Sequence, residues 1–345
     1  MKDLVLVTGG TGYIGSHTVV ELLNEGFHVL IVDNLSNSRL EVLDGIEKIT
    51  GIRPAFEKVD LAETMVVNEL FDKYPDIKAI IHFAAYKAVG ESVEFPLKYY
   101  FNNINSLINL LENMIRLKIP NFVFSSSCTV YGEPDSLPVD ENAPIKKANS
   151  PYGNTKQISE EILQDALHVN DFLKIISLRY FNPIGAHPSA LIGELPLGVP
   201  DNLVPFITQT AYGLREQLLV FGDDYNTPDG SAIRDYINVV DLSRAHVVAI
   251  QRLLDNKNKK GFELFNLGTG RGNSVFEVIN TFEEVTGQKL NYKVVGRRAG
   301  DVEQVYADTK YANDELGWKA EKGLDETLKS AWDWEKFYRE HLEDK

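Results

Sequence analysis

The sequence predicts an α/β protein in which a doubly wound parallel sheet is joined to a smaller C-terminal α/β unit. Short apolar runs alternate with segments of helical period through the first 180 residues, and the runs are continuous, as in strands buried on both faces. A glycine-rich turn follows the first run directly. Beyond residue 180, glycine and proline crowd a stretch with little periodicity. We therefore expect one domain over 1–180 and a second over 181–345, with some chain crossing back near 235–265.

The apolar runs predict the strands in chain order. In the first unit they fall at 4–7, 28–32, 55–59, 79–83, 121–124 and 175–178. The segments between them place apolar residues at spacings of three and four, for example from Leu107 to Leu117, and Gly26 lies where the first helix would end. In the second unit we expect helices near 240–254, 274–286 and 324–341, and short strands near 218–221 and 262–266.

Composition excludes several classes of protein. The 345 residues are enough for about two domains, at roughly 150 residues each. The 35 Lys and Arg against 50 Asp and Glu give a net charge of −15, which repels nucleic acid and anionic membranes. Cys128 is the only cysteine, so we expect neither a disulfide nor a metal site. No apolar run approaches the ~20 residues of a membrane span, and we expect a cytoplasmic protein.

The segment TGGTGYIG at residues 8–15 carries the first chemical signal. Gly9 permits a tight turn, Gly12 lets backbone N–H groups approach a pyrophosphate, and Gly15 allows a helix to pack closely on a strand. Asp33 ends the second run, where its carboxylate would accept both ribose hydroxyls and repel a 2′-phosphate. We therefore expect NAD rather than NADP. Asp60, after the third run, either faces the adenine or is an ordinary surface residue.

Tyr152 and Lys156 carry the second signal. They are four residues apart and lie on one face of a helix if the segment is helical. Ser150 suits an N-cap and Pro151 suits the first helical position, which supports a helix here. The Lys156 ammonium and an oxidised nicotinamide would each lower the pKa of the Tyr152 phenol from about 10 toward neutrality. Tyr152 is therefore the candidate general base.

Three serines, Ser125, Ser126 and Ser127, directly follow the run at 121–124. This position is the carboxyl edge of the predicted sheet, where ligands of such folds bind. We expect Ser127 to bridge a substrate hydroxyl and Tyr152. The alternative is that the serines only form a loop.

A series of motifs resembles the extended short-chain dehydrogenase/reductase family and, within it, the UDP-glucose 4-epimerases. In order they are TGGTGYIGSH, HFAAYKAVGES, SSSCTVYG, the Tyr152/Lys156 pair, RYFNPIGAHP, VFGDDYNTPDGSAIRDYINVVDL and RRAGDV. The resemblance runs nearly end to end. It implies an isomerase that interconverts UDP-galactose and UDP-glucose at C4, by transient oxidation to a 4-keto sugar with bound NAD.

The resemblance implies roles for further residues. Ser127 and Thr129 would order the sugar 4-hydroxyl. Lys156 would bind the nicotinamide ribose, and Lys87 would contact the cofactor diphosphate and the substrate. The other implied cofactor-binding positions are Tyr13, Ile14, Asn34, Asn37, Ser38, Leu61, Phe83, Ala84, Asn102 and Tyr180. The other implied UDP-sugar-binding positions are the phosphate-binding arginines Arg234 and Arg298, together with Asn182, Asn202, Leu203, Phe221, Tyr236 and Asp301.

Val305 bears on the range of substrates. Family members with a bulky tyrosine here exclude a 2-acetamido group, whereas members with a small residue also accept UDP-N-acetyl sugars. The resemblance therefore implies activity on UDP-GalNAc and UDP-GlcNAc as well. The alternative is that the valine only packs.

Two other functions and the assembly state are left open. A nucleotide-sugar 4,6-dehydratase needs an Asp-Glu pair where this chain has Cys128 and Thr129. A regulatory protein that senses NAD without chemistry would not need Tyr152. The resemblance implies a homodimer through helices within 99–118 and 152–168, although core packing alone explains the same apolar faces.

Overall fold

The computed structural model describes residues 2–298 and 301–342, and a seven-stranded parallel sheet forms its centre. The strand order is β11-β6-β5-β4-β1-β2-β3, so the direction of winding reverses between β1 and β4. The strands are β1 (Leu4–Thr8), β2 (His28–Asp33), β3 (Ala55–Lys58), β4 (Ile77–His82), β5 (Asn121–Ser127), β6 (Lys174–Tyr180) and β11 (Phe262–Leu267). This is the predicted doubly wound sheet, and ligands of such sheets bind at the carboxyl ends beside the reversal.

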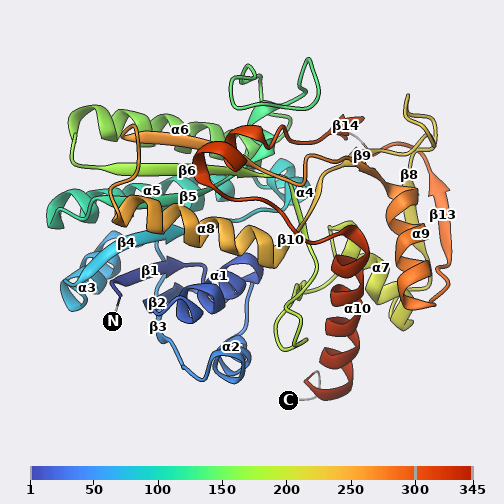
Figure 1. Cartoon of the computed structure of the whole chain (residues 1–345), viewed down its shortest axis with the longest axis horizontal. Helices are drawn as coiled ribbons and strands as arrows, with labels where there is room; N and C mark the ends of the chain where they lie inside the picture. Colours follow the sequence, from blue (N-terminus) through green and yellow to red (C-terminus); the bar gives the residue numbers. More distant parts are fainter. Residues whose placement is uncertain (1, 299–300, 343–345) are drawn as a thin grey trace.

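Helices cover both faces of the sheet, as Figure 1 shows. One face carries α1 (Tyr13–Asn24), α2 (Val42–Thr50) and α8 (Val239–Leu254), and the other carries α3 (Thr64–Lys73), α5 (Pro96–Leu117) and α6 (Pro151–Val169). Alternation along β1 explains the division, because Val5 and Val7 pack in the first core and Leu6 packs in the second. The short helix α4 (Val89–Glu94) and the 3₁₀ turn η1 (Cys128–Tyr131) lie at the carboxyl edge.

A smaller unit follows β6. Its core packs α7 (Leu203–Tyr212), α9 (Val275–Thr286) and α10 (Leu324–His341) against the strand pair β8 (Leu218–Phe221) and β13 (Tyr292–Val295). Short strands complete it: β7 (Asn182–Ile184) pairs with β10 (Tyr236–Asn238), and β9 (Ile233–Arg234) lies between β12 (Asn273–Ser274) and β14 (Gln304–Val305). A single π-helical turn, η2 (Ala312–Leu316), precedes α10.

One strand differs from the expectation. The run at 262–266 was grouped with the smaller unit, although some chain was expected to cross back near 235–265. It forms β11 at the edge of the large sheet, parallel to β6. The helix α8, which precedes it, packs beside α1. The local sequence pattern predicts the length and the burial of a strand. Which sheet the strand joins depends on packing between segments that are far apart in the sequence. The domain boundary at residue 180 stays a prediction.

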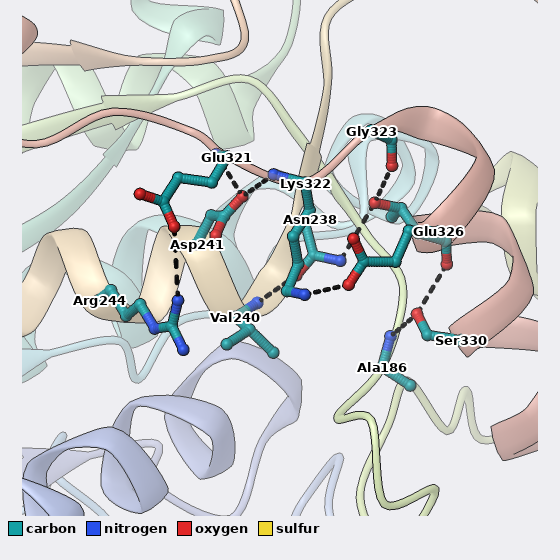
Figure 2. Close-up of polar contacts among 11 residues, drawn as sticks. Ala186, Asn238, Val240, Asp241, Arg244, Glu321, Lys322, Gly323, Glu326 and Ser330 are labelled. Carbon is teal, nitrogen blue, oxygen red and sulfur yellow. Dashed lines mark hydrogen bonds and ion pairs between the residues drawn. The ribbon is translucent and has the colours of Figure 1, made fainter.

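Polar contacts join α10 to α8, as Figure 2 shows. The Asp241 carboxylate on α8 accepts the backbone N–H groups of Glu321 (2.9 Å) and Lys322 (2.8 Å), just before α10 begins. Asn238 donates from its amide to the Thr327 hydroxyl (3.1 Å). Hydrogen bonds therefore hold α8 and the start of α10 in fixed positions relative to each other. Within residues 2–298 and 301–342, no helix has the length and apolar character needed to cross a membrane.

Candidate active site

A cleft of about 1280 Å³ lies between the carboxyl edge of the sheet and the smaller unit. The first unit lines it with the glycine-rich turn, the loops after β2, β3 and β4, and the start of α6. The smaller unit lines it with the loop before α7 and with residues of β9 and β14. The motifs singled out along the whole sequence therefore meet in one cavity.

The glycine-rich turn between β1 and α1 fits a dinucleotide pyrophosphate. Gly9 has a φ of +68°, and a Cβ there would lie 2.9 Å from the backbone nitrogen of Ala84. A Cβ on Gly15 would lie 2.1 Å from the carbonyl oxygen of Gly9. Gly12 is the N-cap of α1 and provides no side-chain cap, so the first N–H groups of the helix are left for a ligand.

Asp33 closes the far end of this cradle. Its carboxylate accepts the Thr11 N–H (3.3 Å), the Leu35 N–H (2.9 Å) and the Ser38 hydroxyl (3.1 Å), which fix its orientation at the end of β2. Asp60 lines the same cleft and accepts the Asn34 amide (3.2 Å). A carboxylate held in this way fits a ribose diol.

Tyr152 and Lys156 lie on the first turns of α6. The helix begins as the sequence predicts, with Pro151 in its first turn and the Ser150 hydroxyl accepting the Gly153 N–H (3.1 Å). Tyr152 is 8% exposed and Lys156 5%. The Lys156 ammonium donates to the carbonyl oxygen of Ser125 (2.7 Å) and lies 6.0 Å from the centre of the Tyr152 ring.

Burial controls the pKa of both side chains. It raises the pKa of the Tyr152 phenol above its ordinary value, and a hydrogen bond with Ser127 opposes this only in part. Burial lowers the pKa of Lys156 to about 8, against the charge of Glu160. The expectation that Lys156 and an oxidised nicotinamide together lower the pKa of Tyr152 toward neutrality stays a prediction. In the protein alone, Lys156 bonds a backbone carbonyl and burial dominates the pKa of the phenol. A low phenol pKa requires a further positive charge beside Tyr152.

The serines lie within β5 and not in a loop after it, because the strand continues to Ser127. Ser125 bonds the Tyr180 hydroxyl (2.8 Å), and Ser126 donates to the buried Glu160 carboxylate (2.7 Å). Ser127 accepts the Thr129 N–H (3.2 Å). Thr129 lines the cleft, and its buried hydroxyl has no hydrogen-bond partner among the described residues, so it is free to bond a ligand.

The smaller unit contributes positive charge. Arg234 and Arg298 both face Asp301, with guanidinium–carboxylate distances of 3.7 and 2.9 Å. Val305 is the register partner of Arg234 between the parallel strands β14 and β9. In a protein of net charge −15, two guanidinium groups at one end of a cleft provide a local site for a phosphate.

Most of the predicted positions line the cleft, and four do not. The lining positions are Gly9, Gly12, Tyr13, Ile14, Gly15, Asp33, Asn34, Asn37, Ser38, Asp60, Leu61, Phe83, Ala84, Lys87, Asn102, Thr129, Tyr152, Lys156, Tyr180, Asn182, Asn202, Arg234, Arg298, Asp301 and Val305. Ser127 and Tyr236 are buried behind the wall, Leu203 packs on the core of the smaller unit, and Phe221 lies under the Arg298 guanidinium.

Several residues of the cleft wall were not predicted, and the carboxylate of Glu194 is one of them. Glu194 lines the cavity between Lys87 and Asn202, in the glycine- and proline-rich stretch that follows β7. That stretch has no periodicity, so nothing local distinguished this carboxylate from a solvated one. Among the described residues, no group of three or more His, Cys, Asp or Glu side chains is arranged to hold a metal ion.

The sequence of this chain is similar to those of known proteins over almost its whole length. Residues 6–331 match the sequence model of a family described as GDP-mannose 4,6 dehydratase. The chain is 48% identical over 335 residues to a UDP-glucose 4-epimerase of Dictyostelium discoideum, covering 97% of this chain and 96% of that one. It is 50% identical over 334 residues, 96% of its length, to the bifunctional protein GAL10 of Pachysolen tannophilus, of which it spans 48%.

Two solved structures are similar over almost the whole chain. A UDP-glucose 4-epimerase from Stenotrophomonas maltophila, with bound NAD and formylated UDP-arabinopyranose, has a TM-score of 0.94 at 46% identity, covering 98% of this chain and 99% of that one. The Bifidobacterium longum enzyme, in complex with NAD+ and UDP, has a TM-score of 0.92 at 44% identity, with 96% and 98% covered.

Proposed function

The chain belongs to the UDP-glucose 4-epimerase family, and on that premise we propose that it interconverts UDP-galactose and UDP-glucose at C4 with NAD held in the cleft. The observation that carries the proposal is a single cavity that joins a dinucleotide cradle, the Tyr152/Lys156 pair and two arginines. The cradle fits NAD because side chains on Gly9 or Gly15 would collide with backbone atoms, and because Asp33 is held for a ribose diol.

Each step assigns a task to a residue of this chain. The glycine-rich turn and Asp33 would hold NAD, which would supply hydride acceptance from C4 of the sugar and hydride return to it. Tyr152 takes the proton from the 4-hydroxyl during the oxidation and gives it back during the reduction. Thr129 donates or accepts at the same hydroxyl. The 4-keto sugar turns about its diphosphate linkage, which Arg234 and Arg298 hold, and presents its other face to the same groups.

Tyr152 can act as a base only if its pKa is lowered. Burial alone raises its pKa, so deprotonation requires cations nearby. Lys156 supplies one, 6.0 Å from the centre of the Tyr152 ring, and an oxidised nicotinamide would supply the other. Tyr152 is therefore activated when the cofactor is in its oxidised form, and it keeps its proton otherwise.

An epimerase explains the site better than the alternatives do. The matched family model is described by a dehydratase activity, but Ser127 is followed by Cys128 and Thr129, and neither supplies the acid–base pair of a 4,6-dehydratase. Burial raises the pKa of the Cys128 thiol to about 12, so it is no acid at neutral pH. A sensor without chemistry would not require the Tyr152, Lys156 and Thr129 arrangement.

Val305 supports the proposal that UDP-GalNAc and UDP-GlcNAc are also substrates. It lies in the cleft wall, and it packs with Val130, Tyr131 and Phe181. A tyrosine at 305 would extend from this wall into the space of a 2-acetamido group. We expect Val305→Tyr to lower kcat/KM for UDP-GalNAc at least tenfold and to leave UDP-galactose turnover within about threefold. Equal losses on both sugars would contradict this assignment.

We also propose a cytoplasmic homodimer. The face of α5 away from the sheet exposes Leu97 and Phe101, which are 80% and 64% exposed. Apolar side chains four residues apart on a helix form one surface stripe, and pairing with a second copy would cover it. A single cysteine, which allows no intramolecular disulfide, suits a reducing compartment.

Loss of Tyr152 tests the chemical proposal. Purified protein incubated with UDP-galactose should form UDP-glucose, and Tyr152→Phe should lower kcat by about 10²–10⁴ while NAD stays bound. The phenyl ring of phenylalanine fills the same space as the ring of Tyr152, so the thermal midpoint should hardly change. Wild-type turnover by Tyr152→Phe would refute the assignment of the base.

A further inference from the structure

A second cavity, of about 430 Å³, lies beside the cleft. Its wall is formed by the loop between β2 and α2, the segment 195–198, the end of α7 with the loop that follows it, and the end of α10. The helices α7 and α10 belong to the smaller unit and the loop after β2 to the large sheet (Figure 1), so both units contribute to the wall. The residues that line both cavities are Arg39, Leu195, Pro196, Leu197 and Tyr338.

The lining of this second cavity carries positive charge. Arg39, Arg215 and Arg339 line it, and no Asp or Glu of the described part of the chain does. Arg339 is balanced, because its guanidinium donates to the Glu335 carboxylate (2.7 Å). Arg39 and Arg215 form no ion pair with any carboxylate within residues 2–298 and 301–342, where their partners are neutral. In a chain of net charge −15, two unbalanced guanidinium groups therefore face one cavity.

Neutral hydrogen bonds hold both guanidinium groups in place. Arg39 donates through Nη1 to the Tyr338 hydroxyl (3.1 Å). Arg215 donates through Nε to the side-chain oxygen of Gln209 (2.9 Å) and through Nη2 to the carbonyl oxygen of Gly198 (3.1 Å). These contacts fix the two groups without cancelling their charge. Each guanidinium has five N–H donors, so most of the donors are left for a ligand.

A phosphate group matches this lining best. It carries a charge of about −1.5 to −2 at pH 7, which balances two guanidinium groups, whereas a carboxylate carries only one charge. Its oxygens also match the paired N–H groups of arginine. The rest of the lining is largely apolar, with Leu195, Pro196, Leu197 and Leu214. The volume lies within the range of about 300–1,000 Å³ that is typical of small-molecule sites, so it leaves room for an organic group beside the phosphate.

We propose that this cavity is a second phosphate-binding site, in which Arg39 of the large unit and Arg215 of the smaller unit hold one phosphate group. The site differs from the end of the cleft where Arg234 and Arg298 lie, because neither of those arginines lines it. The phosphate comes either from a small phosphate monoester or from the free anion. The apolar lining favours the monoester.

Calorimetric titration of the purified full chain tests the proposal, with phenyl phosphate and inorganic phosphate as probes at one ionic strength. We expect saturable binding of one equivalent of phenyl phosphate. Arg39→Gln and Arg215→Gln should each raise its Kd at least tenfold, because each removes charge-assisted hydrogen bonds. Arg298→Gln, which changes the cleft, should leave this Kd within twofold of wild type. Arg271→Gln is the matched control, since Arg271 is exposed and lines neither cavity.

The two probes distinguish the sources of the phosphate. Tighter binding of phenyl phosphate assigns the site to a monoester, and equal binding assigns it to the free anion. No saturable binding of either probe would overturn the proposal, and so would a loss of binding in Arg298→Gln with wild-type affinity in Arg39→Gln. If Arg215→Gln does not fold, Arg39→Gln decides alone, because Arg39 is exposed and its only side-chain contact among the described residues is with Tyr338.

Discussion

Tyr152 and Lys156 are both buried. Burial raises the pKa of the Tyr152 phenol and lowers the pKa of the Lys156 ammonium, so it favours the neutral form of each side chain. The Tyr152 phenol therefore keeps its proton until the positive charge of an oxidised cofactor lies beside it. The Lys156 ammonium lies 6.0 Å from the centre of the Tyr152 ring. A nearby cation stabilises a phenolate, and opposite charges within about 4–6 Å shift a pKa by about one to three units.

Replacement of Lys156 by methionine should move the pH dependence of catalysis. Without the ammonium, the phenolate loses its nearest cation, so the rising limb of kcat against pH should shift upward by about one unit or more. The measurement is kcat for UDP-galactose from pH 6 to 10 in both proteins. An unshifted limb with a uniformly lower kcat would assign Lys156 to ribose binding alone.

Sequence could predict this pair because its spacing has meaning only on a helix, and Ser150 and Pro151 mark where that helix begins. It could not predict the direction of the Lys156 side chain, which is set by the Ser125 carbonyl on a different element. Glu194 was missed for a similar reason, since its partners lie 8 and 107 residues away.

The turn from β1 into α1 leaves no room for side chains at Gly9 and Gly15. A Cβ on Gly15 would lie 2.1 Å from the Gly9 carbonyl oxygen, so Gly15→Ala must push the helix from the strand and deform the pyrophosphate cradle. We expect a loss of about 1–3 kcal/mol in the free energy of unfolding and protein purified without NAD. Denaturant titration and absorbance of the released nucleotide check both. Gly296→Ala, where a Cβ meets nothing within 4 Å, is the control, and a Gly15→Ala protein that retains NAD would contradict the account.

The adjacent helices α1 and α8 each bury a neutral histidine. Burial lowers the pKa of His17 to about 3 and of His246 to about 4. The unfolded chain, with histidine pKa values near 6.5, binds more protons below that pH, so the free energy of unfolding falls as the pH falls from 6.5 toward 4. Each histidine contributes a slope of about 1.4 kcal/mol per pH unit.

Urea unfolding at pH 6.5, 5.5 and 4.5 measures that slope. His246→Gln should reduce it by about 1.4 kcal/mol per pH unit, whereas the exposed His28→Gln should leave it unchanged. An identical slope in the His246→Gln protein would show that this side chain is already charged or accessible in the folded state.

In the whole molecule, the exposed stripe on α5 predicts the state of assembly. Phe101→Glu places a charge in the proposed contact and should convert a dimer into a monomer, as sedimentation velocity would show. Ile52→Glu, at an exposed apolar residue after α2, should leave the dimer intact. Wild-type protein that sediments as a monomer at all concentrations would remove the proposal.

The local sequence pattern predicted the strands and helices of the large sheet more completely than it predicted the division of the chain into two units. Continuous apolar strands with helices between them allow few topologies, and the glycine-rich turn fixes which strand comes first at the ligand edge. The run at 262–266 was grouped with the smaller unit, although chain was expected to cross back near 235–265, because Phe262–Leu267 has the same pattern whichever sheet it joins. The helix α8 packs beside α1, which is more than 200 residues away in the sequence, and this packing brings β11 to β6.

The central claim is that one bound cofactor removes a hydride from C4 and returns it to the same carbon. UDP-galactose carrying deuterium at C4, incubated with the purified protein without added cofactor, tests this directly by mass spectrometry and NMR of the product. We expect UDP-glucose that keeps the deuterium at C4. Loss of the label to solvent, or a 4-keto-6-deoxy product, would contradict it.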